Sequence, residues 1–384
     1  MYNAPLRTFR VDAGTGTLSQ ISATARPGDL FELCGTFSGQ WLFPSTSGTE
    51  DDRITVRSAP GCTATLTVGL YDGGVILDNV SYWVVEGLEI TDIPVPVRMG
   101  SVLSHHNWIR GNRVHNVDSG IDIRRGASFN RIESNLIEEV GSARNRDGNS
   151  GDGIILIDGA SDNLIIGNKV GRAGHAAIES TLQSGTAVST RNVFAFNELA
   201  NTYSGGFIFS GTDADSLVEA NYIHGTGREN APNIGTRSAI NIHGRNAVVH
   251  HNYIADTQSY SLLISSYEFA GVKQNCIANN VYNNTFSVGQ DAAVGWGVRH
   301  GTECRDNRVD NNVFTNHKGR DGADGNMYQV FIDMYSSDSN LWTPEDPKGN
   351  VMSGNSFDRR PFAVLVRLGS PNVYWPETAY PTWN

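Results

Sequence analysis

Three ionisable side chains could carry out chemistry if the fold brings them together: Glu179, His243 and Arg299. Each lies in a short segment of alternating apolar and polar residues. These segments are GHAAIEST (174–181), SAINIHG (238–244) and GWGVRHG (295–301). When the segments are aligned by their inward apolar residues, the three side chains share one outward column of a parallel sheet. Neighbouring strands lie ~4.8 Å apart, so the column would line a groove suited to an extended polysaccharide.

β-Elimination on a uronate sugar needs a cation to neutralise the carboxylate, a base and an acid. We expect Arg299, with Arg237 at the mouth of the neighbouring strand, to neutralise the carboxylate. His243 is the first choice of base because imidazole titrates near neutral pH. Other candidates are Lys273 or Tyr267 as the base and Tyr260 or Tyr203 as the acid. The competing interpretations are an exposed turn residue for His243 and simple ion pairing for Arg299.

Two further residues complete the predicted groove. Asp333 extends the outward column of His243 and Arg299, and Asn241 lies in the column beside it. Both are predicted to bind substrate, together with Tyr203, Tyr260, His175 and Arg146.

A second chemistry is hydrolysis or glycosyl transfer by two carboxylates. Asp152 and Glu179 are expected on adjacent coils near His175, with Arg146 and Asp147 on the loop above. Retaining pairs stand ~5–5.5 Å apart and inverting pairs ~6.5–9.5 Å, and adjacent coils could supply either spacing. The competing interpretation is that Asp147 and Asp152 only shape a Gly-rich turn.

That turn, DGNSGDG (147–153), lacks the ligand spacing of a calcium loop. The sequence therefore names no metal ligands, and Ca²⁺ bound between turns stays a secondary prediction.

A third class is a non-catalytic, glycan-binding surface module of the phage-fibre type. It predicts an outer face of Ser, Thr and Asn without clustered charge. The mixture of Glu179, His243, Arg237 and Arg299 on one sheet favours an enzyme instead.

The element that must position these side chains is a repeat of the form Asn-x-apolar-x-x-Asn-x-apolar. Clear copies are 107–114, 130–137, 163–170, 192–199, 279–286, 307–314 and 350–357. Successive copies, with weaker ones at Asn221 and Asn252, are 23 to 43 residues apart, a period typical of a solenoid. We expect the asparagines to stack as ladders in the turns. Because the strand segments between them alternate with period two, the solenoid is all-β.

Composition agrees with a folded all-β chain. Glycine is abundant, at 42 residues, and only 18% of residues are charged, which excludes a disordered polyelectrolyte. The net charge of −11 argues against nucleic acid as a partner. The longest apolar runs fall short of the ~18 residues of a membrane span, so no membrane partner is expected.

The four cysteines form two pairs with equal spacing, Cys34/Cys62 and Cys276/Cys304. Cys276 and Cys304 each lie three residues before the first Asn of a repeat, so they would stack on neighbouring coils at a separation that suits a disulfide. Either two bridges or four buried thiols fit the pattern. Bridges would favour an exported protein.

Three parts of the chain are expected. Residues 1–30 form an N-terminal cap whose segment TGTLSQISATARPGD predicts a short helix ending at Pro27. Residues 31–370 form the solenoid, and residues 371–384 form an extended C-terminal tail that seals the last coil.

The repeat, together with the opening ATARPGDLFELCGTFSG and DDRITVRSAPG, resembles the pectate-lyase-like superfamily. This resemblance implies a single-stranded right-handed parallel β-helix. GVRHGTECRDNRVDNNVF (297–314) is similar to the Arg-His-Gly coil of polysaccharide lyase family six, the alginate lyases and chondroitinase B. The family's catalytic Arg maps onto Arg299. Its base is a Lys on the preceding coil, where this chain has Tyr267 near the expected place and Lys273 several residues later.

Together these observations predict a secreted or periplasmic enzyme that acts on a polysaccharide. A lyase is favoured over a hydrolase, and a hydrolase over a fibre module.

Overall fold

The computed structural model describes most of the chain. The described residues are 5–68, 73–141, 151–182, 187–203, 205–209, 213–227, 238–269, 272–290, 293–298, 302–318, 320–321, 327–328, 330–334, 348–358, 363–368 and 372–376. They divide into two compact units, residues 1–175 with 182–193 and residues 176–181 with 194–384.

Each coil of the first unit consists of three short strands, one for each of three sheets. Sheet 1 comprises β1 (Arg7–Asp12), β2 (Asp29–Ser38), β4 (Ile54–Ser58), β7 (Trp83–Glu86), β10 (Trp108–Arg110), β13 (Arg131–Glu133) and β16 (Leu164–Ile166). Sheet 2 comprises the end of β2, β5 (Ala64–Thr67), β8 (Glu89–Thr91), β11 (Arg113–Val117), β14 (Leu136–Val140) and β17 (Lys169–Ala173). Sheet 3 comprises β3 (Trp41–Leu42), β6 (Gly74–Ile76), β9 (Val97–Met99), β12 (Ile121–Arg124) and β15 (Ile154–Ile157).

The second unit repeats the same three-strand coil. Its sheet 1 comprises β24 (Leu217–Glu219), β27 (Val248–His250), β32 (Asn280–Tyr282), β36 (Arg308–Asp310) and β41 (Val351–Ser353). Its sheet 2 comprises β21 (Glu198–Ala200), β25 (Tyr222–Thr226), β28 (Tyr253–Thr257), β33 (Thr285–Gly289), β37 (Val313–His317) and β42 (Ser356–Phe357). Its sheet 3 comprises β18 (Ala176–Thr181), β22 (Gly205–Phe209), β26 (Ile240–Ile242), β29 (Leu262–Phe269), β34 (Val294–Val298), β40 (Val330–Met334) and β43 (Ala363–Leu368).

The remaining strands are short pieces of the turns and the C-terminal segment. They are β19 (Ser189–Thr190), β23 (Asp213–Ala214), β30 (Val272–Gln274), β31 (Cys276–Ile277), β35 (Cys304–Arg305), β38 (Arg320–Asp321), β39 (Met327–Tyr328) and β44 (Asn372–Pro376). The strand β20 (Val193–Ala195) belongs to sheet 1, where it pairs with β24. Within the predicted tail 371–384, the structure describes only β44, which pairs antiparallel with β43.

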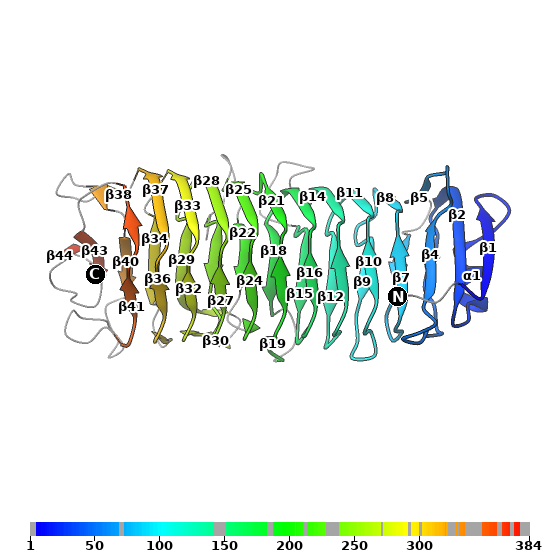
Figure 1. Ribbon diagram of the computed structural model, residues 1–384, viewed down its shortest axis with the longest axis horizontal. Helices are drawn as coiled ribbons and strands as arrows, with labels where there is room; N and C mark the ends of the chain where they lie inside the picture. The colour runs from blue at the N-terminus through cyan, green and yellow to red at the C-terminus, as the bar shows by residue number, and fades with distance from the viewer. Residues whose placement is uncertain are drawn as a thin grey trace. The chain divides into compact units, whose positions relative to one another are not determined.

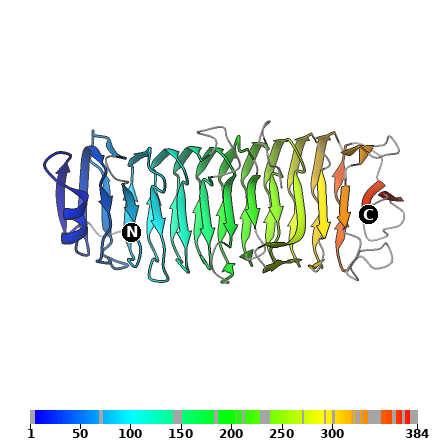
Figure 2. The same cartoon turned by 180° about the vertical axis from the view of Figure 1, so that it is seen from behind.

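Pairing between coils is parallel and in register. In the first unit, β10, β11 and β12 follow one another along the chain and pair with β13, β14 and β15 of the next coil. Figures 1 and 2 show this arrangement within each unit, with equivalent strands side by side. Inward positions are aliphatic: Ile121 and Ile123 stack on Ile154 and Leu156, and all four are fully buried. The predicted all-β, right-handed parallel β-helix is confirmed.

Asparagine ladders join the coils where sheet 1 turns into sheet 2. The Asn112 amide nitrogen donates to Asn135 Oδ1 (3.0 Å) and to the Val85 carbonyl of the preceding coil (3.0 Å). In the second unit, Asn221, Asn252 and Asn284 repeat the pattern at 2.9 Å. The residue before each asparagine has left-handed backbone geometry even without glycine, as at Ser134 (φ 54°). The predicted ladders are confirmed, and they satisfy polar groups that burial would otherwise leave unpaired.

Of the two alternatives for the cysteines, the structure shows the disulfides. Cys34 pairs with Cys62 and Cys276 with Cys304, with Cα atoms 5.5 and 4.5 Å apart. Cys276 and Cys304 lie directly opposite each other on β31 and β35. This bridge therefore joins the same position of two neighbouring coils, whereas Cys62 lies in the turn before β5 and bridges back to β2 of the preceding coil.

The predicted capping helix is α1 (Leu18–Thr24). The Thr17 side chain accepts from the Gln20 backbone, and the Gln20 side chain accepts from the Thr17 backbone, which forms a capping box. Two residues of the helix, Leu18 and Ile21, are buried. No helix in the described part of the chain is long and apolar enough to cross a membrane.

A buried histidine in the second unit depends on a glycine beside it. His317 lies opposite Gly289 on the neighbouring strand, and its Nε2 is 2.6 Å from Ser261 Oγ. A Cβ at Gly289 would approach the ring closely, at 2.8 Å from Nε2. The preceding coil has Thr257 at this position, opposite Gly289. The absence of a side chain at 289 therefore makes room for His317.

We expect Gly289→Ala to lower the free energy of unfolding by about 1–3 kcal/mol, because the new methyl group displaces the buried ring. Denaturant unfolding measures this change. In a His317→Ala background the same substitution should cost less than about 0.5 kcal/mol, since nothing remains to clash with. An equal cost in both backgrounds would contradict the explanation.

Two buried titratable groups of the second unit make stability change with pH in opposite directions. Burial raises the pKa of Asp213 to about 7, although hydrogen bonds from Ser180 and Ser216 counteract the shift. Burial lowers the pKa of His317 to about 4. Between pH 3.8 and 7 the folded state retains the Asp213 proton that the unfolded chain loses, so stability falls as pH rises. Between pH 6.5 and 4 the unfolded chain protonates His317 first, so stability falls as pH drops.

Asp213→Asn should therefore raise the free energy of unfolding near pH 7 by a few kcal/mol, on the order of 1.4 kcal/mol for each factor of ten by which folding weakens this acid. The gain should shrink to almost nothing as the pH approaches 4. Thermal or denaturant unfolding of both proteins across this range gives the difference profile. A gain that does not depend on pH would show that Asp213 is ionised in the folded protein.

Candidate active site

Sheet 3 of the second unit brings three of the predicted site residues to one face. Glu179 on β18 pairs with Ile208 on β22, and Ile208 pairs with Asn241 on β26. Glu179 and Asn241 therefore share a column two strand spacings apart, about 10 Å. His243 follows β26 two residues after Asn241, which places it on the same face.

The predicted column itself was wrong in register. Glu179 aligns with Asn241 rather than His243, and Ser265 pairs with Gly297, two residues before Arg299. Asp333 pairs with Gly297 and so keeps its predicted place in the His243 column, by its backbone position. The error has a simple cause. A shift of two residues leaves every side chain on the same face, so alternation alone does not fix the register.

The expected open outer wall is also wrong at these positions. Glu179, Asn241 and His243 are only 8%, 1% and 4% exposed. His243 is therefore not an exposed turn residue. Burial excludes water around these groups, which strengthens their electrostatic interactions with a bound ligand.

The partners of His243 fix which ring nitrogen carries the hydrogen. Nδ1 lies 2.7 Å from the Ser265 carbonyl oxygen and 2.9 Å from Ser265 Oγ. A carbonyl only accepts, so Nδ1 must carry a proton and donate it. In the neutral ring Nε2 then holds the lone pair, which is the arrangement of a general base.

Asn241 has an unused hydrogen-bonding capacity. Its side chain is buried, and neither the amide oxygen nor the amide nitrogen has a partner among the described residues. An unpaired buried amide costs about 1–3 kcal/mol per group. Such a cost is expected where a side chain is kept ready for a ligand.

The aromatic candidates lie at the start of neighbouring strands. Tyr260, before β29, is half-buried, and its ring packs over Gly295, where a Cβ would lie 2.9 Å from Tyr260 Cγ. Tyr203, before β22, is also half-buried.

The hairpin of β29 and β30 holds the two alternative bases. Lys273 is exposed and pairs with Glu268, which places it on the antiparallel strand rather than in a column of sheet 3. Tyr267 pairs with Gln274 in the same hairpin. Arg299, Arg237 and Arg146 lie outside the described residues, so their roles stay predictions.

The first unit contains a second oriented imidazole. His175 Nδ1 lies 2.9 Å from Asp152 Oδ1, and both side chains are largely buried. The His175 backbone nitrogen donates to the Gly151 carbonyl (3.0 Å), which holds the segment in place. Glu179, the predicted partner carboxylate of Asp152, belongs to the second unit. The carboxylate pair therefore stays a prediction, as does Ca²⁺.

Sequence reasoning missed the two groups that orient these rings. It assigned no role to Ser265 and treated Asp152 as a carboxylate to pair with Glu179 rather than as the partner of His175. Every residue has a backbone carbonyl, so a hydrogen bond to one cannot be predicted from the residue types in the sequence. For Asp152 and His175, the sequence did hold a signal: the two residues are 23 positions apart, about the length of one coil.

Comparisons with known proteins bear on the fold. No family model matches the sequence, and a comparison with curated proteins finds no match. Among solved structures, the catalytic domain of a GH87 α-1,3-glucanase in complex with nigerose is similar at 12% identity and a TM-score of 0.60, over 96% of this chain and 69% of that one. The Dettilon tailspike protein is similar at 12% identity and a TM-score of 0.57, over 95% and 69% of the two chains.

This protein, the glucanase and the tailspike protein share the parallel β-helix fold. An alginate lyase from Paenibacillus sp. str. FPU-7 matches more loosely, with 18% identity and a TM-score of 0.46, over 81% of this chain and 99% of that one. At such identities the likeness concerns the fold, and function must be argued from the side chains.

Proposed function

We propose that the protein is a carbohydrate-active enzyme that cleaves a uronate-containing polysaccharide by β-elimination. The observation that carries the proposal is the geometry of His243, whose Nδ1 donates to the Ser265 carbonyl and whose Nε2 is therefore the basic nitrogen. The nearby Asn241, whose buried amide has no partner in the described part of the chain, supports a ligand on this face.

The proposed reaction assigns one task to each group. His243 Nε2 takes the proton from C5 of the uronate, and a double bond forms between C4 and C5 as the C4–O bond breaks. Tyr260 or Tyr203 gives a proton to the departing oxygen. Arg299, assisted by Arg237, neutralises the uronate carboxylate so that negative charge can develop beside it. Asn241 would hold a sugar hydroxyl or the carboxylate through its amide.

Two disulfides support a secreted or periplasmic location, since such bonds persist in oxidising compartments. We therefore place the proposed activity outside the cytoplasm.

His243→Gln should reduce kcat/KM at least ~100-fold, because glutamine can still donate to the Ser265 carbonyl but cannot take a proton. Growth of ultraviolet absorbance from unsaturated uronate, over a panel of acidic polysaccharides, measures the activity. Arg299→Ala should lose activity to a similar extent, whereas the exposed Lys273→Ala should retain it. Full activity in both His243→Gln and Arg299→Ala would show that the site is misplaced.

Hydrolysis by the predicted carboxylate pair Asp152 and Glu179 is the second candidate function, since His175 holds the largely buried Asp152 carboxylate in position (2.9 Å). In that case reducing ends would form without unsaturated product, and Asp152→Asn, rather than His243→Gln, would abolish turnover. Glycan binding without either product would indicate a fibre module instead. Under our proposal, Asp152→Asn leaves the elimination rate within about threefold of wild type, a barrier change of less than ~1 kcal/mol.

A further inference from the structure

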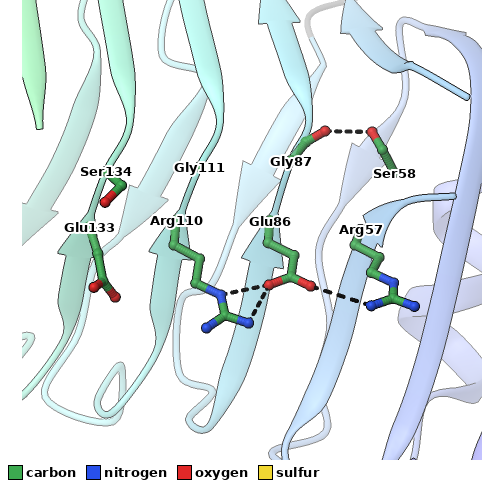
Figure 3. A pocket seen from close by; sticks show the side chains of 8 residues that line it. All are labelled: Arg57, Ser58, Glu86, Gly87, Arg110, Gly111, Glu133 and Ser134. Carbon is green, nitrogen blue, oxygen red and sulfur yellow. Dashed lines mark hydrogen bonds and ion pairs between the residues drawn. The ribbon is translucent and has the colours of Figure 1, made fainter. Parts of the chain in front are cut away.

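A row of alternating charges crosses sheet 1 of the first unit. Arg57, Glu86, Arg110 and Glu133 occupy the same position on four successive strands, β4, β7, β10 and β13. Figure 3 shows the four side chains standing side by side above the sheet. The row spans three strand spacings, about 14 Å.

Ion pairs hold these side chains in fixed positions. Arg110 Nε donates to Glu86 Oε2 (2.6 Å), and Arg57 Nη1 lies 3.8 Å from the other oxygen of Glu86. Arg57 also pairs with Glu32 (2.6 Å), and Glu133 accepts from Arg131 (2.8 Å). The guanidinium and carboxylate groups of the row remain partly exposed, between 20% and 37%. The row thus presents an ordered set of donors and acceptors whose formal charges cancel.

A hollow lies beside the row, at the turn that leads from sheet 1 to sheet 2. It has a volume of about 460 Å³, and two glycines, Gly87 and Gly111, form part of its wall. Both glycines have left-handed backbone geometry (φ 63° and 60°), and a Cβ on either would meet nothing within 4 Å. These two turns therefore place no side chain in the open space beside the row.

Other coils show that a side chain fits at this turn. The equivalent residue, directly before the second asparagine of the repeat, is Ser134 in the next coil. In the second unit it is Phe196, which is 63% exposed, and also Asn283 and Asn311, both with φ 54°. Left-handed geometry alone thus does not require glycine here, and glycine at 87 and 111 keeps these two turns free of side chains.

We propose that this hollow is a non-catalytic binding site for a neutral, hydroxyl-rich saccharide. Sugar hydroxyls both donate and accept hydrogen bonds, so they match a row in which guanidinium and carboxylate groups alternate. The charges are already paired with each other, which gives a polyanion no net attraction. The volume of the hollow lies within the range of small-molecule sites, and the hollow is broad and open to solvent. The site goes beyond the proposed elimination activity and does not depend on it.

Calorimetric titration of the intact protein with a panel of neutral oligosaccharides, comprising α-glucan, β-glucan and mannan fragments, tests this proposal. We expect at least one class to bind, with little change in affinity as salt is raised, because neutral ligands are not screened. Gly111→Asn should weaken that binding at least about tenfold, because the amide fills the hollow while asparagine tolerates the left-handed turn.

The matched control is Gly167→Asn, the same substitution at the same turn position (φ 63°) in a coil that does not line the hollow. It should bind as wild type does. Ser134→Asn, at a lining position that already carries a side chain, gives a second obstructing variant if Gly111→Asn does not fold. Absence of binding to the whole panel, or equal affinity in the obstructed and control variants, would overturn the proposal.

The two proposals can be tested independently of each other. Gly111→Asn should retain the elimination activity on uronate polymers, and His243→Gln should retain binding of the neutral saccharide. Loss of both properties in one folded variant would mean that the hollow and the active site are one functional site, which would also overturn the proposal.

Discussion

Hydrogen bonds between buried asparagine side chains are the constraint on which the rest of this structure depends. At Asn112 and Asn135, for example, the amide nitrogen donates both to the next asparagine and to a carbonyl of the preceding coil. A strand that slipped along its neighbour would break these bonds and leave the amides buried without partners. Parallel pairing of short strands is weakly specified by alternation alone, so the turns hold the coils in register.

Because the register is fixed, residues that are far apart in the sequence lie at defined distances from each other in the sheet. Residues 60 or more positions apart, such as Glu179 and Asn241, come to lie in one column because their strands are held two spacings apart. The same constraint aligns Arg57, Glu86, Arg110 and Glu133 in the first unit. Long-range columns of this kind bring side chains from several coils together on one face, which is the basis of both proposed sites.

The fold could be predicted from the sequence because its signals are repeated and local. The Asn repeat, the period-two strands and the equal cysteine spacing each indicated stacked coils, and the structure confirms them. The site was harder to predict. The alternation in Ala176–Thr181 permits two registers that differ by two residues, and the sequence offered no means to choose between them. The orienting partner of His243 is the backbone carbonyl of Ser265, which side-chain types do not reveal.

The proposed mechanism depends on which ring nitrogen of His243 carries the hydrogen. If His243 is the base, its Nε2 must carry no hydrogen in the neutral ring, because Nδ1 donates to Ser265. A long-range ¹H–¹⁵N correlation spectrum of the imidazole groups, assigned by comparison with His243→Gln, measures this state directly. The account predicts that neutral His243 is the Nδ1–H tautomer. Finding the hydrogen on Nε2 instead would contradict it.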